Sequence, residues 1–393
     1  MSLLKLFGNS LISAFNDKIC YLNETTSWSH MIDFSSPYEK GRPLKYFDGN
    51  NEKHPREDID QQIELSGGLN IITSLEVHEN KSLLAIVTSD KSLFLYKIEN
   101  FDGPECLKLL SRRLVARASS CMQFSAGGRF VIVCDKSGDC YEYDCENITK
   151  PGRWILGHMS QVLAILVNSD DSLIVTSERD EKIRVTKYPQ CHTIQTFCLG
   201  HTEFVSDLKF LDTQNDTMLL SLSGDETLRI WEYRTGKELL QKQLKLPGIR
   251  LATKHLDDGY TLVVILCYKP NTLAVYRITT ENNLQCEFIQ DLKTTEKNIY
   301  TALTLDDHNN LIAQIINADT SEASLKKYKF DREKNKFSVD NNDFSSEHIL
   351  SNLNKEHFPY TDKVSSLFKK KFDNIKVYLE RKRKRIDDTN KEF

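Results

Sequence analysis

Hydrophobic and polar positions along the chain repeat with a constant spacing. Four aspartates, each 45 residues after the last, precede short alternating segments; they are Asp90, Asp135, Asp180 and Asp225. One further step reaches Pro270, which is followed by a segment of the same kind. A repeat of about 20–50 residues indicates an architecture built by stacking one structural unit. The spacing therefore predicts a repeat fold.

The aligned segments alternate as a β-strand does. Three and five residues after the anchor most copies are apolar, as in Leu228 and Ile230. The column between them is mixed and holds Phe94, Asp139, Arg184, Arg229 and Ala274. Because successive side chains of a strand point to opposite faces, we expect the apolar columns to pack in the core and the mixed column to point outward. The sixth position is mostly aromatic, and in the second copy Tyr141 and Tyr143 are alternatives for it.

The best copy runs from Gly200-His201 to Trp231-Glu232 and resembles a WD repeat, which has a period of about 40–45 residues. A second Gly-His pair, Gly157-His158, lies 43 residues upstream. Each such repeat forms a four-stranded sheet that packs on both neighbours, so the ring must close. Seven blades of this size need about 315 residues. We therefore expect an all-β, seven-bladed WD40 β-propeller with a basic α-helix at the C-terminus.

The expected propeller occupies residues 1–330. Its blades are placed at 1–24 with 65–75, and then at 76–110, 111–150, 154–192, 193–237, 238–282 and 283–330. The polar, proline-containing stretch at 35–68 is expected to be a long mobile loop. A linker is expected at 331–362, followed by a basic amphipathic helix and tail at 363–393.

Charge changes the picture at the C-terminus. The chain has 52 Lys and Arg against 56 Asp and Glu, a net charge of −4. Between Lys363 and Arg385, however, ten basic residues stand against Asp373 and Glu380. With apolar residues at helical steps from Phe368, this segment predicts a helix that presents cations to a phosphate backbone. The alternative is a helix docked on the propeller, with the basic run serving only for nuclear import.

The best repeat also contains residue types found in hydrolases: His201, Asp225 and a nearby serine, either Ser221 or Ser223. In a WD repeat we instead expect His201, Asp225 and Trp231 to form a buried hydrogen-bond network that ties strands together. No GxSxG, Walker or GxGxxG motif occurs. The sequence therefore favours a binding protein, and a propeller hydrolase is the weaker hypothesis.

Other signals limit the chemistry further. No CxxC pair occurs, so we expect no metal site, and without an export signal the ten cysteines are expected to be reduced thiols. The longest apolar run, 262–268, is far shorter than the ~20 residues of a membrane helix, so no membrane contact is expected.

A charged cluster stands at 178–184, where six of seven residues are ionisable. On pattern alone, Arg184 in the outward column is a solvated surface charge. The alternative is a paired contact between its guanidinium and a protein partner.

Several stretches resemble a narrower family. They are 135–139, 156–158, 178–185, 198–206, 368–374 and 378–382. They are similar to the WD-repeat, non-catalytic subunits of tRNA (guanine-N7-)-methyltransferase. The resemblance runs from about residue 70 to 280 and again from 366 to 386. Where the family prefers aspartate, this chain has Glu178.

The resemblance implies a subunit that is not itself an enzyme. It would bind and stabilise a separate, Rossmann-like catalytic subunit as a heterodimer, through Lys136, Glu181 and Arg184. S-adenosylmethionine would be bound by that partner, and this chain would need no cofactor. The helix would help to hold tRNA, whose variable-loop guanine is methylated at N7. The candidate tRNA-binding residues are Lys369, Lys370, Lys371, Arg381, Lys382, Arg383, Lys384 and Arg385.

We expect the protein in the nucleus, with the cytoplasm as a second location. The alternative function is a general WD-repeat scaffold, either a ubiquitin-ligase substrate receptor or a chromatin-binding propeller, because the fold alone does not decide between such roles.

Overall fold

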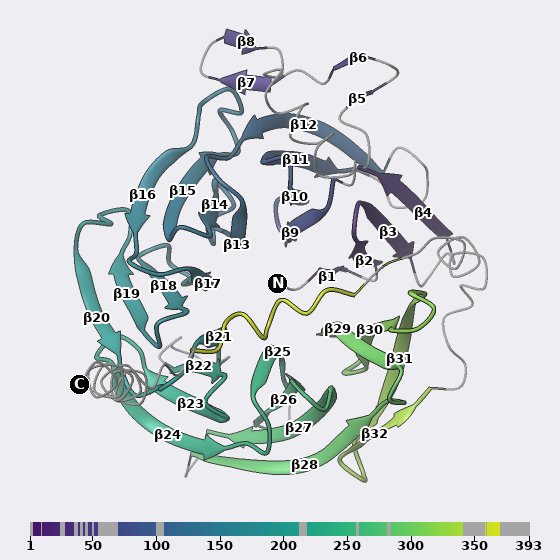
Figure 1. Cartoon of the computed structure of the whole chain (residues 1–393). Coiled ribbons are helices and arrows are strands. Elements are labelled where there is room, and N and C mark those ends of the chain that lie inside the picture. The colour runs from purple at the N-terminus through teal and green to yellow at the C-terminus, as the bar shows by residue number, and fades with distance from the viewer. Residues whose placement is uncertain are drawn as a thin grey trace, which may run out of the picture. The chain divides into compact units, whose positions relative to one another are not determined.

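Seven four-stranded antiparallel sheets follow one another around a ring in the computed structural model (Figure 1). The structure describes residues 3–8, 10–23, 28–34, 38–39, 42–43, 46–48, 51–53, 70–99, 106–211, 218–256, 259–280, 284–340, 358 and 360–369. The prediction of an all-β, seven-bladed propeller is confirmed. Most of the C-terminal segment predicted to be helical, residues 370–393, lies outside the described residues.

Each blade uses four consecutive strands. Blade 1 contains β1 (Leu4–Phe7), β2 (Ser10–Phe15), β3 (Lys18–Asn23) and β4 (Trp28–Asp33). Blade 2 contains β9 (Ile72–His78), β10 (Leu83–Thr88), β11 (Ser92–Ile98) and β12 (Leu107–Leu114). Blade 3 contains β13 (Ser119–Phe124), β14 (Phe130–Asp135), β15 (Asp139–Asp144) and β16 (Arg153–Gly157). Blade 4 contains β17 (Val162–Val167), β18 (Leu173–Glu178), β19 (Ile183–Lys187) and β20 (Ile194–Cys198).

The remaining blades follow the same order. Blade 5 contains β21 (Val205–Phe210), β22 (Met218–Ser223), β23 (Thr227–Glu232) and β24 (Lys237–Gln243). Blade 6 contains β25 (Gly248–His255), β26 (Tyr260–Cys267), β27 (Thr272–Thr279) and β28 (Gln285–Lys293). Blade 7 contains β29 (Asn298–Leu305), β30 (Leu311–Asn317), β31 (Ala323–Asp331) and β32 (Lys336–Val339). In every blade the first strand faces the centre of the ring and the fourth lies at its rim (Figure 1).

The core is distributed over the seams between blades. Leu93 and Leu95 pack in the cluster between blades 2 and 3, whereas Phe94 packs in the cluster between blades 1 and 2. The mixed column is therefore not outward-facing, because both faces of each sheet are covered by neighbouring blades. Ala274 and Arg229, from the same column, are buried as well. The alternation distinguishes one seam from the other and does not separate core from solvent.

The ring closes without exchange of strands between its ends. Blade 1 takes all four strands from Leu4–Asp33, so the expected pairing of 1–24 with 65–75 is wrong. Segment 72–78 opens blade 2 instead. Side-chain packing joins blades 7 and 1, and the Gln314 amide donates to the Ala14 carbonyl at 2.9 Å. The buried Phe358 ring adds to this seam by packing on Phe15.

Two boundaries differ from expectation. The propeller extends to Val339 and not to residue 330, because β32 is an exposed rim strand whose polar sequence resembles a linker. Within the expected loop at 35–68 the structure describes two ribbons, β5 (Tyr38–Glu39) with β6 (Arg42–Pro43), and β7 (Tyr46–Asp48) with β8 (Asn51–Lys53). The rest of that loop lies outside the described residues.

A second unit covers residues 362–393. Its described part, 362–369, forms turns in which the Asp362 carboxylate accepts from the backbone N–H groups of Val364 and Ser365 at 3.0 and 3.1 Å. Of the candidate tRNA-binding residues only Lys369 is described, and it is exposed. The others lie outside the described residues.

Candidate protein interface

Blade 5 contains a closed hydrogen-bond network. The Trp231 indole N–H donates to Ser221 Oγ at 2.8 Å, and this oxygen lies 2.7 Å from His201 Nε2. His201 Nδ1 lies 2.9 Å from Asp225 Oδ2. An indole nitrogen can only donate, so the bonds run in one direction, from Trp231 through Ser221 and His201 to the carboxylate. The structure thus brings the three network residues together, with Ser221 as the link.

The network leaves no room for hydrolysis at Ser221. Ser221 and Trp231 are fully buried, and His201 is nearly so. Burial raises the pKa of Asp225, but hydrogen bonds from His201, Thr227 and a backbone N–H outweigh it, so the pKa lies well below its usual range. A serine that already accepts an indole N–H inside the core cannot meet a substrate. This geometry is that of a strand tie.

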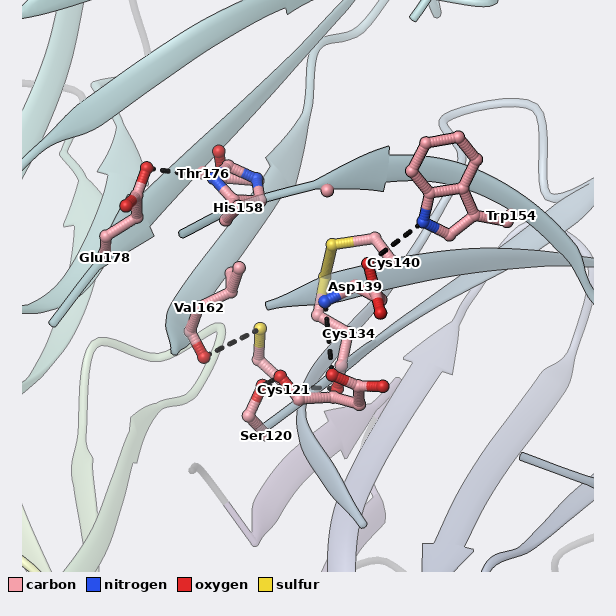
Figure 2. The surroundings of a disulfide bond; sticks show 12 residues. Ser120, Cys121, Cys134, Asp139, Cys140, Trp154, His158, Val162, Thr176 and Glu178 are labelled. Atoms are coloured by element: carbon pink, nitrogen blue, oxygen red, sulfur yellow. Dashed lines mark hydrogen bonds and ion pairs between the residues drawn. A yellow bond between two sulfur atoms is a disulfide. The ribbon is translucent and has the colours of Figure 1, made fainter. Parts of the chain in front are cut away.

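Blade 4 holds the second Gly-His pair in a different arrangement. His158 Nδ1 lies 2.9 Å from Glu178 Oε1, and Arg184 Nη2 lies 3.0 Å from His158 Nε2 (Figure 2 shows His158 and Glu178). Arg184 Nη1 also donates to the Gly157 carbonyl at 3.0 Å. The expectation that Arg184 is a solvated outward charge is therefore wrong, because its column faces blade 3 and its guanidinium is half-buried against the connection between the blades.

The other two expected partner-binding residues lie on turns. Lys136 is exposed in the turn between β14 and β15. Glu181 is half-buried in the turn between β18 and β19, where its φ is +72°. The two turns are equivalent positions of adjacent blades and so open on the same side of the ring.

The connection at 157–161 joins these turns. The His158 N–H donates to the Gly138 carbonyl at 3.0 Å, and the Arg179 N–H donates to the Gln161 carbonyl at 2.9 Å. Gly138 has a φ of +101°, and a Cβ there would lie 2.6 Å from the His158 carbonyl oxygen. Only glycine permits this approach of turn to connection. Hydrogen bonds therefore join the two turns to the connection and make one continuous surface. We call this surface the blade 3–4 face (135–139, 154–161, 178–184 and Leu199).

A disulfide joins the two strands that flank the Lys136 turn, and Figure 2 shows its surroundings. Cys134 and Cys140 are directly opposed on β14 and β15 and are joined. The expectation that all ten cysteines are thiols is wrong for this pair, because strand register brings the two sulfurs together without any spacing motif. The other eight cysteines are thiols. Burial raises the pKa of the neighbouring Cys121 thiol to about 12, which leaves it protonated.

Sequence reasoning missed the apolar part of this face. Trp154 is 60% exposed, and its indole N–H donates to Asp139 Oδ1 at 3.1 Å (Figure 2). Met159 is 97% exposed and Leu199 is 62% exposed. A tryptophan outside the aromatic column of the repeat was the available signal for Trp154. The sequence repeat gives no signal that marks Met159 or Leu199.

Among the described residues no group of three or more His, Cys, Asp or Glu side chains could hold a metal ion. In the same part of the chain no helix is long and apolar enough to cross a membrane.

The ring, the strand order and the blade 5 network define a WD-repeat β-propeller. A chain of the crystal structure of the mitotic checkpoint complex has the same fold, with a TM-score of 0.59 and 13% identity, covering 80% of this chain and 83% of that one. That likeness shows the fold alone.

The particular family follows from sequence comparison. The family model described as the tRNA methyltransferase TRM82 WD40 domain matches residues 24–152 and 146–339. The tRNA (guanine-N(7)-)-methyltransferase non-catalytic subunit wuho of Aedes aegypti is 48% identical over 403 residues, covering 100% of this chain and 98% of that relative. The protein of the same name from Drosophila melanogaster is 35% identical, covering 82% and 77%. The chain therefore belongs to the family of non-catalytic WD-repeat subunits of tRNA (guanine-N7-)-methyltransferase, which confirms the predicted family and its non-catalytic role.

Proposed function

We propose that this chain binds the catalytic subunit of tRNA (guanine-N7-)-methyltransferase as a heterodimer, stabilises it and helps to hold tRNA. S-adenosylmethionine is bound by that partner and not by this chain. The names of the relatives support the proposal, because a non-catalytic subunit implies a separate catalytic one. We further propose a nuclear location, in line with the basic tail.

The blade 3–4 face is the observation that carries the proposal. Lys136, Glu181 and Arg184 all belong to it, although they come from two blades. Hydrogen bonds tie both turns to the connection between them, so the three residues are held in fixed relative positions. Charged residues of both signs on a rigid surface suit a protein partner, for which they supply orientation and specificity.

Reconstitution tests the proposal. The purified catalytic subunit, S-adenosylmethionine and tRNA are incubated with and without this chain, and N7-methylguanosine is quantified. We expect activity to rise when the chain is present and a one-to-one complex to appear by size-exclusion chromatography with light scattering. If the chain neither binds the enzyme nor changes methylation, the proposal is wrong and the general scaffold becomes the better interpretation.

The tail is tested separately. Alanine replaces Lys369–Lys371 and Arg381–Arg385 in one variant, leaving the propeller unchanged. Each lost phosphate contact should reduce the steepness of log K against log salt by about 0.7–0.9, so tRNA binding should become weaker and less salt-dependent. Affinity for the catalytic subunit in the absence of tRNA serves as the control. Unchanged tRNA affinity and salt dependence would show that the tail makes no phosphate contact.

A further inference from the structure

Three large apolar side chains are exposed on the blade 3–4 face. Trp154 lies on β16, Met159 follows β16 and Leu199 follows β20. Single exposed apolar residues are common on any surface and need no explanation. These three differ because Met159 and Leu199 lie on consecutive blade connections and Trp154 lies on the strand that leads into the first of them.

Their backbone surroundings place them beside the charged turns. Ile183 pairs with Cys198, so Leu199 follows directly beside the turn that contains Glu181. Trp154 lies over Gly157, since a Cβ on that glycine would be 3.2 Å from Cζ2 of the indole. Met159 is the next residue after His158, whose ring is held by Glu178 and Arg184.

The connection that displays Met159 is fixed before any partner arrives. The Arg184 guanidinium bonds the Gly157 carbonyl, and the His158 N–H bonds the Gly138 carbonyl. The His158 side chain itself is fully buried, with none of its surface exposed. A pre-organised loop loses little conformational entropy on binding, which makes an exposed side chain on it an effective anchor. Tryptophan and methionine are enriched in the centres of protein interfaces.

The surrounding charges identify the kind of partner. The turns next to the apolar residues carry both signs, with Asp139, Asp180 and Glu181 beside Lys136, Arg179 and Lys182. Because the carboxylates offset these cations, the surface lacks the excess of positive charge that a nucleic-acid backbone requires. A protein surface with an apolar hollow and a rim of mixed charge would complement these residues.

We propose that Trp154, Met159 and Leu199 form the apolar centre of the contact with the catalytic subunit, and that Lys136 and Glu181 form its charged rim. This inference rests on the proposed function and adds the side chains that supply most of the affinity. Hot spots occupy the centres of interfaces, whereas rim charges mainly orient the partner.

Two aspartate substitutions test the centre: Met159→Asp and Leu199→Asp. Ile194→Asp is the matched control, because Ile194 is 46% exposed at the opposite end of β20 in the same blade. Affinity for the purified catalytic subunit is measured by calorimetry. Loss of a hot spot lowers affinity by roughly 30-fold or more, so we expect that loss for each of the two variants and less than about twofold for the control. Unchanged melting temperatures show that all three proteins are folded.

A second readout reports on Trp154 without disturbing it. The chain is labelled with 5-fluorotryptophan, and its fluorine resonance is assigned with Trp154→Phe. We expect this resonance to shift on addition of the catalytic subunit, while the resonance of the buried Trp231 stays in place.

The outcomes separate the two proposals. If the wild-type chain does not bind the catalytic subunit, the proposed function fails and this inference fails with it. If wild type binds while Met159→Asp and Leu199→Asp bind equally well, or the Trp154 resonance does not move in the complex, only the apolar centre is wrong.

Discussion

Blades 4 and 5 share one sequence pattern but complete their hydrogen bonds differently. Strand register makes Arg184 equivalent to Arg229, since they pair with Thr176 and Ser221. In blade 5 the network is closed by Trp231. In blade 4 Thr186 takes the position of Trp231, and His158 is instead hydrogen-bonded to Arg184. Both histidines lie on the connection that precedes their blade, so what differs is the partner of Nε2, a serine hydroxyl for His201 and a guanidinium for His158.

The two arginines show what this conversion does to charge. Arg229 forms an ion pair with Glu238 and donates from Nε to Thr227 Oγ1, so its charge is balanced inside blade 5. Arg184 has no carboxylate within ion-pair distance in the described part of the chain, and its buried Nε has no hydrogen-bond partner there. Burial lowers the pKa of Arg184, although the guanidinium stays charged at neutral pH. Blade 4 therefore keeps a cation that its own residues only partly compensate.

The largest expected effect concerns the closed network. Trp231→Ala removes a fully buried indole and leaves Ser221 without its donor, so the free energy of unfolding should fall by roughly 3–5 kcal/mol. Thr186→Val is the matched change in blade 4. The buried Thr186 Oγ1 has no partner among the described residues, so this variant should be neutral or slightly stabilising. Urea unfolding measures both. Equal losses from the two variants would contradict the contrast between the blades.

The second effect concerns binding. Arg184→Glu should weaken the complex with the catalytic subunit by about 2–5 kcal/mol, or roughly 30-fold to several thousandfold, because it reverses an incompletely compensated charge and frees the 157–161 connection. Arg229→Glu places the same change in the equivalent column of blade 5. It should lower stability and leave the affinity within a few-fold of wild type. Normal binding by Arg184→Glu, with the propeller folded, would remove Arg184 from the interface.

Much of the fold could be predicted because the repeat is carried by strand residues whose spacing is fixed by backbone geometry. The strand register of blade 3 could not be predicted from the sequence. Cys134 pairs with Cys140 as Leu222 pairs with Leu228, so Tyr143 and not Tyr141 is equivalent to Trp231. Asp135 lies two residues before the position that Asp225 takes in blade 5. An anchor residue of the right type can occur at the wrong place in a turn, and sequence spacing does not reveal it.

The site was harder to predict than the fold for a physical reason. A strand pattern shows which residues share a face but not what covers that face. The strand pattern places Arg184 on the solvent side, whereas its guanidinium is covered by the connection between blades 3 and 4. The sequence marks His158 only as part of a Gly-His pair, because its partners Glu178 and Arg184 are 20 and 26 residues away. Contacts between blades depend on packing that no single repeat encodes.

The smallest expected effect is a pH dependence confined to blade 4. A guanidinium can only donate, so His158 Nε2 accepts from Arg184 and Nδ1 carries the proton toward Glu178. Burial lowers the pKa of His158 from its ordinary value of 6.5, and the Arg184 charge lowers it further, while Glu178 acts in the opposite direction. Below about pH 6.5 the unfolded chain therefore binds a proton more readily than the folded one, so this group reduces stability as pH falls.

His158→Gln isolates that contribution. Glutamine can accept from Arg184 and donate to Glu178 but does not titrate, and all other ionisable groups stay the same. Each unit of pKa difference between the folded and unfolded states corresponds to about 1.4 kcal/mol. We expect the stability advantage of wild type over His158→Gln, measured by urea unfolding, to be constant above pH 7 and to shrink between pH 6.5 and 5. An advantage that grows on acidification would mean that His158 is held as a cation by Glu178, and that Arg184 does not donate to it.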